Sequence, residues 1–326
     1  MLNKLTCSPT STDTWCLPES LISRSIGRFT FVILAITLAF AATSVMAQSV
    51  VYDAVPGTLN PAYPSQPFQA QQTNEFGDYV NLAGTNRVLN SVTITMVTWA
   101  FEADAGNVAY CALYPALCSP TGWNHDFTLN IYGTPTGAAN VRDVGPLLAT
   151  VTQTKFVPWR PAEDPVNCPT KDNPGYAFKW QAVPGPPDTN CYNGFAYNVT
   201  FDMSSLNTVL PNDVVIGIVY NTQTYGPSPL GVGGPFNSLN VAVPNGNVAT
   251  VGTDDNTNNV FWNTETAGWY TDGGASGIDE FREDSNWSPY GTVPIRITAT
   301  PIIREVDDDL AQCPSATFST IQAAVT

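Results

Sequence analysis

The sequence predicts an all-β protein, an antiparallel β-sandwich of the jelly-roll-like kind. Of the 326 residues 43% are hydrophobic and only 12% are charged, and the chain holds 24 Gly and 27 Pro. This composition is typical of strands joined by tight turns. In Thr93-Ile94-Thr95-Met96 apolar and polar residues alternate, as in a half-buried strand. No apolar stripe with the period of a helix is expected before Thr317.

Short apolar or alternating runs mark the expected strands and end in Gly, Pro or Asn. In chain order they are 72–82, 87–101, 127–132, 147–157, 195–201, 214–221, 239–243, 260–263, 269–271 and 292–300. Two irregular insertions, 102–124 and 158–194, interrupt them. We therefore expect one sandwich domain over residues 48–300, a linker over 301–312 and the start of another unit over 313–326.

The N-terminal segment has the features of an export signal. The apolar run 29–42 follows Arg24 and Arg28 and is too short to span a bilayer comfortably. Because Val45-Met46-Ala47 follows it, we expect a signal peptide over 1–47, with an over-long n-region, that is cleaved after Ala47. The mature chain would then have no membrane span and would be secreted or held at the cell surface. The alternative is an uncleaved membrane anchor.

The cysteines of an exported chain are expected to form disulfides. Proximity in sequence favours Cys111–Cys118 and Cys168–Cys191, although four cysteines allow three pairings. A metal site at Cys111 and Cys118 is the competing idea, but no second ligand pair has metal-binding spacing. Cys313 is left over.

Charge and histidine content exclude several classes of function. With 12 Lys+Arg against 27 Asp+Glu the formal charge is −15, so no basic surface is available for nucleic acid. A single histidine, His125, excludes multi-histidine metal sites and leaves little room for a Ser-His-Asp triad. The acidic run 279–284 could supply a carboxylate pair for glycoside hydrolysis, but a solvated loop is the preferred interpretation, and no catalytic residue is predicted.

Candidate ligand-binding residues cluster between 254 and 272. Trp262, Trp269 and Tyr270 could stack on sugar rings, with Asn263 and Asp272 binding the hydroxyls. The alternative, which we weigh more heavily, is that these rings fill the ends of the sandwich. No EF-hand spacing is present, but Asp254 and Asp255 offer oxygen ligands for a structural calcium, the one cofactor considered.

The tail, residues 306–325 (VDDDLAQCPSATFSTIQAAV), resembles the entry to right-handed parallel β-helix domains of the pectin-lyase-like class. The resemblance implies a capping helix at the open end of a solenoid whose coils would lie beyond residue 326. Cys313 would then pair with a cysteine in that missing part.

A second resemblance covers residues 156–289. The segments behind it include VPWRP (157–161), CYNGF (191–195) and FWNT (261–264). They resemble a β-sandwich module of bacterial secreted and surface multidomain proteins whose function is undefined. The resemblance implies an architecture and a location, and no reaction.

These observations favour a non-catalytic surface module that binds glycan or acts as a structural spacer. Its expected partner is a polysaccharide or another cell-envelope component. The alternative is an accessory domain of a polysaccharide-degrading enzyme whose catalytic β-helix lies beyond residue 326.

Overall fold

The computed structural model describes residues 48–171, 178–220, 234–235, 239–303, 316–320 and 323. Residues 47–302 form one compact unit, and the described residues after Ile302 lie outside it. The expected signal peptide, Cys313, and most of the expected linker and β-helix start lie outside the described residues. Both large sheets lie within the unit formed by residues 47–302.

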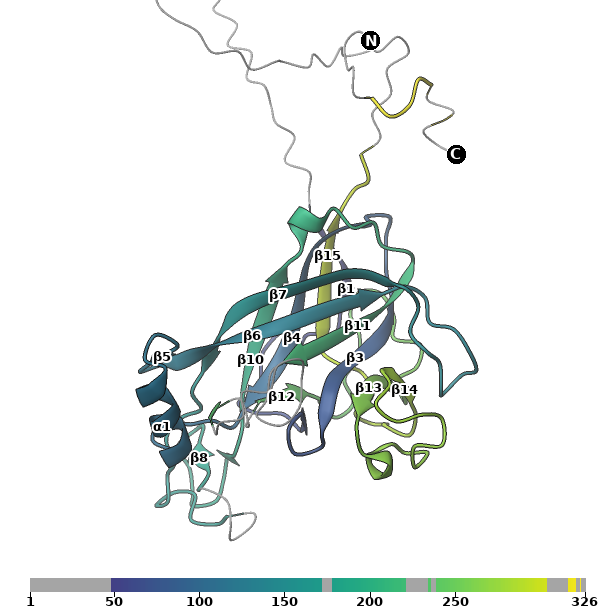
Figure 1. The fold of residues 1–326 in the computed structure, drawn as a ribbon. Helices are drawn as coiled ribbons and strands as arrows, with labels where there is room; N and C mark the ends of the chain where they lie inside the picture. Colours follow the sequence, from purple (N-terminus) through teal and green to yellow (C-terminus); the bar gives the residue numbers. More distant parts are fainter. Residues whose placement is uncertain are drawn as a thin grey trace, which may run out of the picture. The chain divides into compact units, whose positions relative to one another are not determined.

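Two antiparallel sheets pack face to face (Figure 1). In the first sheet the strands follow the order β1 (Ser49–Asp53), β15 (Ile295–Thr300), β4 (Val88–Thr98), β12 (Leu239–Ala242) and β2 (Ser65–Pro67), and β10 (Phe195–Asp202) also pairs with β4. In the second the order is β14 (Arg282–Asp284), β13 (Val260–Thr264), β3 (Thr73–Asn81), β11 (Asp213–Tyr220), β6 (Gly122–Tyr132) and β5 (Cys118–Ser119), and β7 (Leu147–Pro158) pairs with β6. The expected antiparallel sandwich is confirmed.

Period-two patterning determines which side chains fill the space between the sheets. Phe76 and Val80 of β3 face Ile94 of β4 and Ile297 of β15 in one buried apolar cluster. Threonines occupy the opposite face of β4, where Thr93 Oγ1 lies 2.8 Å from Thr200 Oγ1 of β10. The alternation read from the sequence thus matches the two faces of this sheet.

One insertion contains a helix, which corrects the expectation of an irregular segment without a helix. In α1 (Ala105–Leu113) the carboxylate of Asp104 caps the first turn, and its Oδ1 accepts hydrogen bonds from the backbone N–H of Gly106 and Asn107. The Cys111–Cys118 disulfide ties the end of the helix to β5. Because Val108 and Leu113 are exposed, this helix has no buried apolar stripe by which it could have been predicted.

Residues 269–271, expected as a strand, form no strand. A single turn, η3 (Ala267–Trp269), ends here, and Tyr270 N–H donates to the carbonyl of Ala267. The turn carries the aromatic ring of Tyr270 inward, where burial and hydrogen bonds outweigh the strand preference of Trp, Tyr and Thr.

A two-stranded sheet, β8 (Trp180–Gln181) and β9 (Cys191–Tyr192), lies in the second insertion. The Cys168–Cys191 disulfide joins β9 to the preceding segment of that insertion. Both disulfides expected from sequence proximity are therefore present, and they are typical of a protein that folds in an oxidising compartment. The helix α1 and strand β8 lie at the same end of the sandwich (Figure 1).

Candidate functional site

The aromatic residues expected to bind sugar are divided between the core and the surface. Trp262 is only 1% exposed, and its ring centroid lies 5.3 Å from that of Tyr270, which is also buried. The indole Nε1–H of Trp262 donates to Asp284 Oδ2 over 3.0 Å. The hydroxyl of Tyr270 donates to the carbonyl of Glu280 over 2.9 Å. In this conformation neither ring offers a face to a ligand.

The three remaining candidates do not share a surface with these rings. Trp269 is 45% exposed in η3. Asn263 lies on β13, paired in register with Glu75 of β3. The carboxylate of Asp272 accepts a bidentate contact from Arg282 Nη2, at 3.0 and 3.1 Å. The guanidinium of Arg282 also lies 4.0 Å from the Tyr270 ring centroid, so Asp272 is joined to the buried rings through Arg282 as part of the structure and not as a stacking platform.

The acidic run 279–284, expected as a solvated loop, contains a buried strand. Glu283 of β14 is held by Arg142, whose Nε donates to Oε2 over 2.8 Å and whose Nη2 donates to Oε1 over 2.6 Å. Burial raises the pKa of Glu283, but hydrogen bonds from Arg142 and Asn259 outweigh it and hold the pKa below its ordinary value. The carboxylates of β14 are thus structural, because fixed donors satisfy them inside the fold.

The two aspartates expected to bind calcium point in different directions. Asp254 is partly buried, and its Oδ2 accepts a hydrogen bond from Thr292 Oγ1 over 2.5 Å. The carboxylate of Asp255 instead accepts from Asn81 Nδ2 over 2.8 Å, at the exposed surface. Among the residues that the structure describes, no group of three or more His, Cys, Asp and Glu side chains forms a metal cluster.

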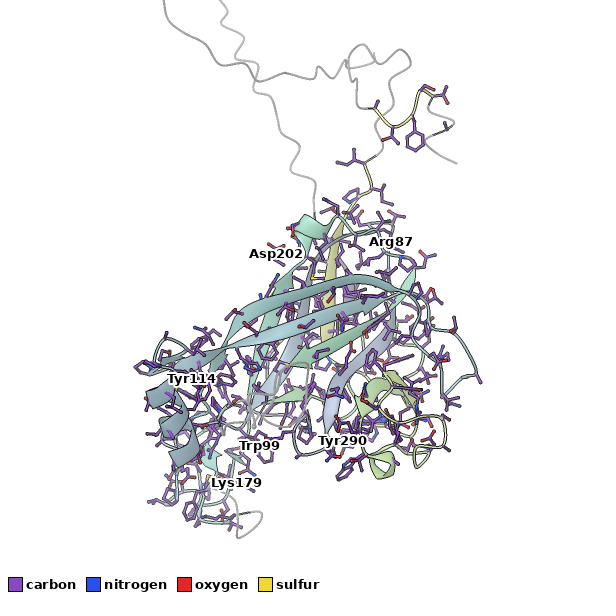
Figure 2. The ribbon with its side chains drawn as sticks, in the orientation of Figure 1. Arg87, Trp99, Tyr114, Lys179, Asp202 and Tyr290 are labelled. Atoms are coloured by element: carbon purple, nitrogen blue, oxygen red, sulfur yellow. A yellow bond between two sulfur atoms is a disulfide. The ribbon has the colours of Figure 1, made fainter. Side chains whose placement is uncertain are left out.

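A different set of aromatic side chains borders an open groove of about 290 Å³, which we call the Trp99 groove. Figure 2 shows two of its residues, Trp99 and Lys179, at the lower end of the sandwich. Trp99, which directly follows β4, is 38% exposed. The residues that give the groove its chemistry are Tyr63, Trp99, Lys179, Tyr192, Asn193 and Gly194. Three aromatic rings thus stand beside an ammonium group and a carboxamide.

The groove is built by segments that are far apart in sequence. The segment with Tyr63 is fastened by two backbone hydrogen bonds, from Ala196 N–H to Pro61 and from Val243 N–H to Pro64. Tyr192 belongs to β9, beside Cys191 of the disulfide. The tertiary fold therefore supplies this juxtaposition.

Gly194 fixes how the Trp99 ring lies. A Cβ at position 194 would come within 2.8 Å of Trp99 Nε1 and 2.4 Å of Val97 Cγ1. The carbonyl of Gly194 accepts a hydrogen bond from the indole of the buried Trp180 over 2.9 Å. A side chain at position 194 would force the Trp99 ring to move.

Arg160 links the segment of Trp99 to the segment of Phe178 and Lys179. Its Nε donates to the carbonyl of Trp99 over 3.1 Å, and its Nη2 donates to the carbonyl of Phe178 over 3.2 Å. The guanidinium also lies 4.4 Å from the centroid of the Phe101 ring. A buried, multiply bonded arginine thus limits movement of the groove walls.

Two larger cavities lack exposed aromatic faces. The one beside α1, of about 380 Å³, has Trp159 in its wall, but that ring is buried. The other, of about 510 Å³, is lined mainly by aliphatic residues and prolines such as Pro146 and Leu148. The Trp99 groove is smaller but combines rings with hydrogen-bonding groups.

Sequence reasoning missed Trp99 as a site residue because it continues an expected strand, 87–101, and reads as part of the core. The segment CYNGF (191–195) belongs to the resemblance to β-sandwich modules, yet nothing in it indicates that Tyr192 lies near Trp99. An aromatic residue at the end of a strand, followed by a polar insertion, is the signal that was present.

Comparison with known proteins returned no match among family models, curated proteins or solved structures. Within the described part of the chain, no helix is long and apolar enough to cross a membrane. The geometry of the sandwich and its surface is therefore the basis for assigning a function.

Proposed function

We propose that this sandwich is a non-catalytic module, secreted or displayed at the cell surface, that binds glycan in the Trp99 groove. The observation that carries the proposal is the partly exposed ring of Trp99, bordered by Tyr63 and Tyr192 in one groove. The aromatic residues named from the sequence do not carry it, because Trp262 and Tyr270 are buried.

Glycan suits this surface for a chemical reason. One face of a pyranose ring is apolar and stacks on an indole or phenol ring, while its hydroxyls need polar partners. Lys179 and Asn193 lie at the same groove and supply donors, and the amide oxygen of Asn193 can also accept. Since the disulfide, Gly194 and Arg160 hold the walls, little ordering entropy would be lost on binding.

The test is retention of the full chain on a panel of immobilised polysaccharides, followed by titration with the polymer that retains it. Trp99→Ala should weaken binding by about tenfold or more, because an aromatic anchor in a groove contributes more than about 1.4 kcal/mol. Trp269→Ala is the matched control, since it removes an exposed indole elsewhere on the same domain. Its affinity should stay within twofold of the unmodified chain.

Each outcome is decisive. If Trp269→Ala lost binding while Trp99→Ala kept it, the Trp99 groove would not be the glycan site. The site expected from the sequence around Trp269 would then be favoured. No retention on any polymer, by a chain that unfolds cooperatively, would refute glycan binding and favour a structural spacer. Both variants should retain the melting temperature, because both rings are partly exposed.

The jelly-roll-like class and the β-helix that the tail resembles belong to this proposal as well. They support a module that stands beside another domain on an exported protein. An accessory role in polysaccharide degradation is the alternative, and it would require binding and cleavage of the same polymer by one longer chain.

A further inference from the structure

Asp78 is a carboxylate inside the sandwich. It lies between Phe76 and Val80 on the core-facing side of β3 and is 2% exposed. Its Oδ1 accepts from the backbone N–H of Tyr79 over 2.8 Å, and its Oδ2 accepts from that of Val293 over 3.0 Å. Backbone amides solvate a carboxylate but do not neutralise its charge.

A second carboxylate lies close by. Asp254 accepts from the hydroxyl of Thr292, the residue directly before Val293, so consecutive residues hold the two aspartates. Burial raises the pKa of Asp78, and the neighbouring charge of Asp254 raises it further. The described arginines of this region are paired with other carboxylates: Arg142 with Glu283, Arg282 with Asp272, and Arg296 with Asp53.

The phenol of Tyr52 is the independent observation. Tyr52 is fully buried on β1, and its hydroxyl forms no hydrogen bond with any described atom. Its ring lies against the loop that carries Asp254, since a Cβ at Gly252 would come within 2.9 Å of Tyr52 Cδ2. After burial itself, the charges of Asp78 and Asp254 raise the pKa of Tyr52. A buried hydroxyl beside two carboxylates ordinarily donates to one of them. A hydroxyl that ligates a cation turns its oxygen toward the ion and need not donate to a neighbouring carboxylate, and calcium takes such oxygen ligands at about 2.3–2.6 Å.

We propose that the protein binds one Ca²⁺ ion between Asp78 and Asp254, with the Thr292 hydroxyl and the Tyr52 phenol as neutral oxygen ligands. Two carboxylates balance the charge of a divalent ion, so the filled site would be neutral inside the fold. A donor set made only of oxygens selects a hard cation over zinc or copper. This assignment replaces Asp255 by Asp78 as the partner of Asp254, because the carboxylate of Asp255 is bonded to Asn81 at the surface.

The rival explanation is a proton shared by the two carboxylates. The groups that act on the pair come from several elements: Tyr52 of β1, Asp255 beside Asp254, Glu283 of β14, and Thr292 before β15. A shared proton would make the fold less stable as pH rises through the raised pKa of the pair, with or without calcium. Calcium would instead stabilise the fold at neutral pH.

The experiment uses the full chain, freed of metal by a chelator and titrated with CaCl₂ at pH 7.5 by calorimetry. We expect one ion per chain and a melting temperature several degrees higher with calcium than with chelator. Asp254→Asn should weaken calcium binding at least tenfold. Asp255→Asn is the matched control, with the same change of charge one residue away, and its affinity should stay within twofold.

If Asp254→Asn fails to fold, Tyr52→Phe tests the proposal instead. Its fold should be retained, since the phenol oxygen takes part in no described hydrogen bond. This variant should fold and bind calcium three- to tenfold more weakly. The proposal is overturned if the unmodified chain binds no calcium, if Asp254→Asn or Tyr52→Phe binds it as the unmodified chain does, or if Asp255→Asn loses binding equally. Glycan retention is measured separately, so either proposal can fail alone.

Discussion

Glu75 shows how the outer face of a sheet can bury a charge. It lies on β3, is 7% exposed, and its Oε1 accepts from Asn130 Nδ2 over 3.0 Å. The hydroxyl of Tyr132 donates to the same carboxylate over 3.1 Å. Gly217 makes space for the Glu75 carboxylate, because a Cβ at position 217 would lie 2.0 Å from Glu75 Oε1. Burial raises the pKa of Glu75 to about 7 despite these two hydrogen bonds.

This raised pKa makes the stability of the fold depend on pH. Because the pKa in the folded state is raised above the ordinary value of 4.5, the contribution of Glu75 is fully present below pH 4.5 and is lost as pH rises through about 7. Glu75→Gln removes this titration. Relative to the unmodified chain, it should gain on the order of 3 kcal/mol of unfolding free energy between pH 5 and pH 8.

Urea unfolding at the two pH values measures this difference. Asp126→Asn removes an exposed carboxylate on β6 of the same sheet and is the control, which should show the pH dependence of the unmodified chain. If the unfolding free energy changed equally with pH in Glu75→Gln and in the unmodified chain, the raised pKa would not belong to Glu75.

Trp262 and Trp269 were grouped by the sequence, yet they should respond very differently to substitution. Trp262→Ala leaves a large cavity and takes one donor from the buried Asp284, so it should cost about 3–5 kcal/mol of unfolding free energy. Trp269→Ala should cost far less, about 0.5 kcal/mol, because this residue is 45% exposed. Denaturant titration with no ligand present checks both values, and equal costs would refute a core role for Trp262.

At the scale of elements, the two disulfides constrain different parts of the surface. Cys111–Cys118 spans a sequence separation of 7 and holds α1 against β5, whereas Cys168–Cys191 spans 23 and holds β9. Only the second lies beside the proposed glycan site, because Cys191 and Tyr192 both border the Trp99 groove. The two bonds therefore allow a matched comparison.

Replacing Cys168 and Cys191 together by serine should weaken polysaccharide binding several-fold and speed amide hydrogen exchange across residues 191–195. The physical reason is that β9 loses its covalent anchor, a constraint of about 3 kcal/mol in the unfolded-chain model. The corresponding change at Cys111 and Cys118 should leave binding within twofold. If both pairs affect binding equally, the groove does not depend on its local disulfide.

For the molecule as a whole, the first strand, β1, pairs with the last, β15, and forms one edge of the first sheet. Tyr52 of β1 is in register with Ile297 of β15, and Asp53 with Arg296, whose Nη2 lies 3.0 Å from Asp53 Oδ2. Val51 and Tyr52 are fully buried. The stability of the sandwich should therefore depend on where the N-terminus begins.

A chain that starts at Gln48 should melt at the temperature of the full chain, as expected if residues 1–47 are a leader. A chain that starts at Ala54 lacks β1 and loses the burial of two large side chains, at a cost of about 4 kcal/mol or more. Differential scanning calorimetry compares the three. A clearly lower melting temperature for the chain from Gln48 would mean that the preceding segment contributes to the fold.

Long alternating runs were sufficient to predict the principal strands. The runs 72–82, 87–101 and 147–157 coincide with β3, β4 and β7 within a few residues. Elements of two or three residues, such as β8 and β14, could not be found this way. Two or three residues are too few to show a period, so no local pattern marks these elements.

The sequence alone determined the fold class, through period-two patterning, and both disulfides, through proximity and the logic of export. Only the tertiary structure decided which polar and aromatic residues lie inside. Glu283 and Asp78 are buried because fixed donors satisfy their carboxylates, and Trp262 is buried because Asp284 accepts from its indole N–H. Trp99 is partly exposed because its strand ends at the edge of the core. Local sequence cannot show this, since most of the partners of these groups lie far away along the chain.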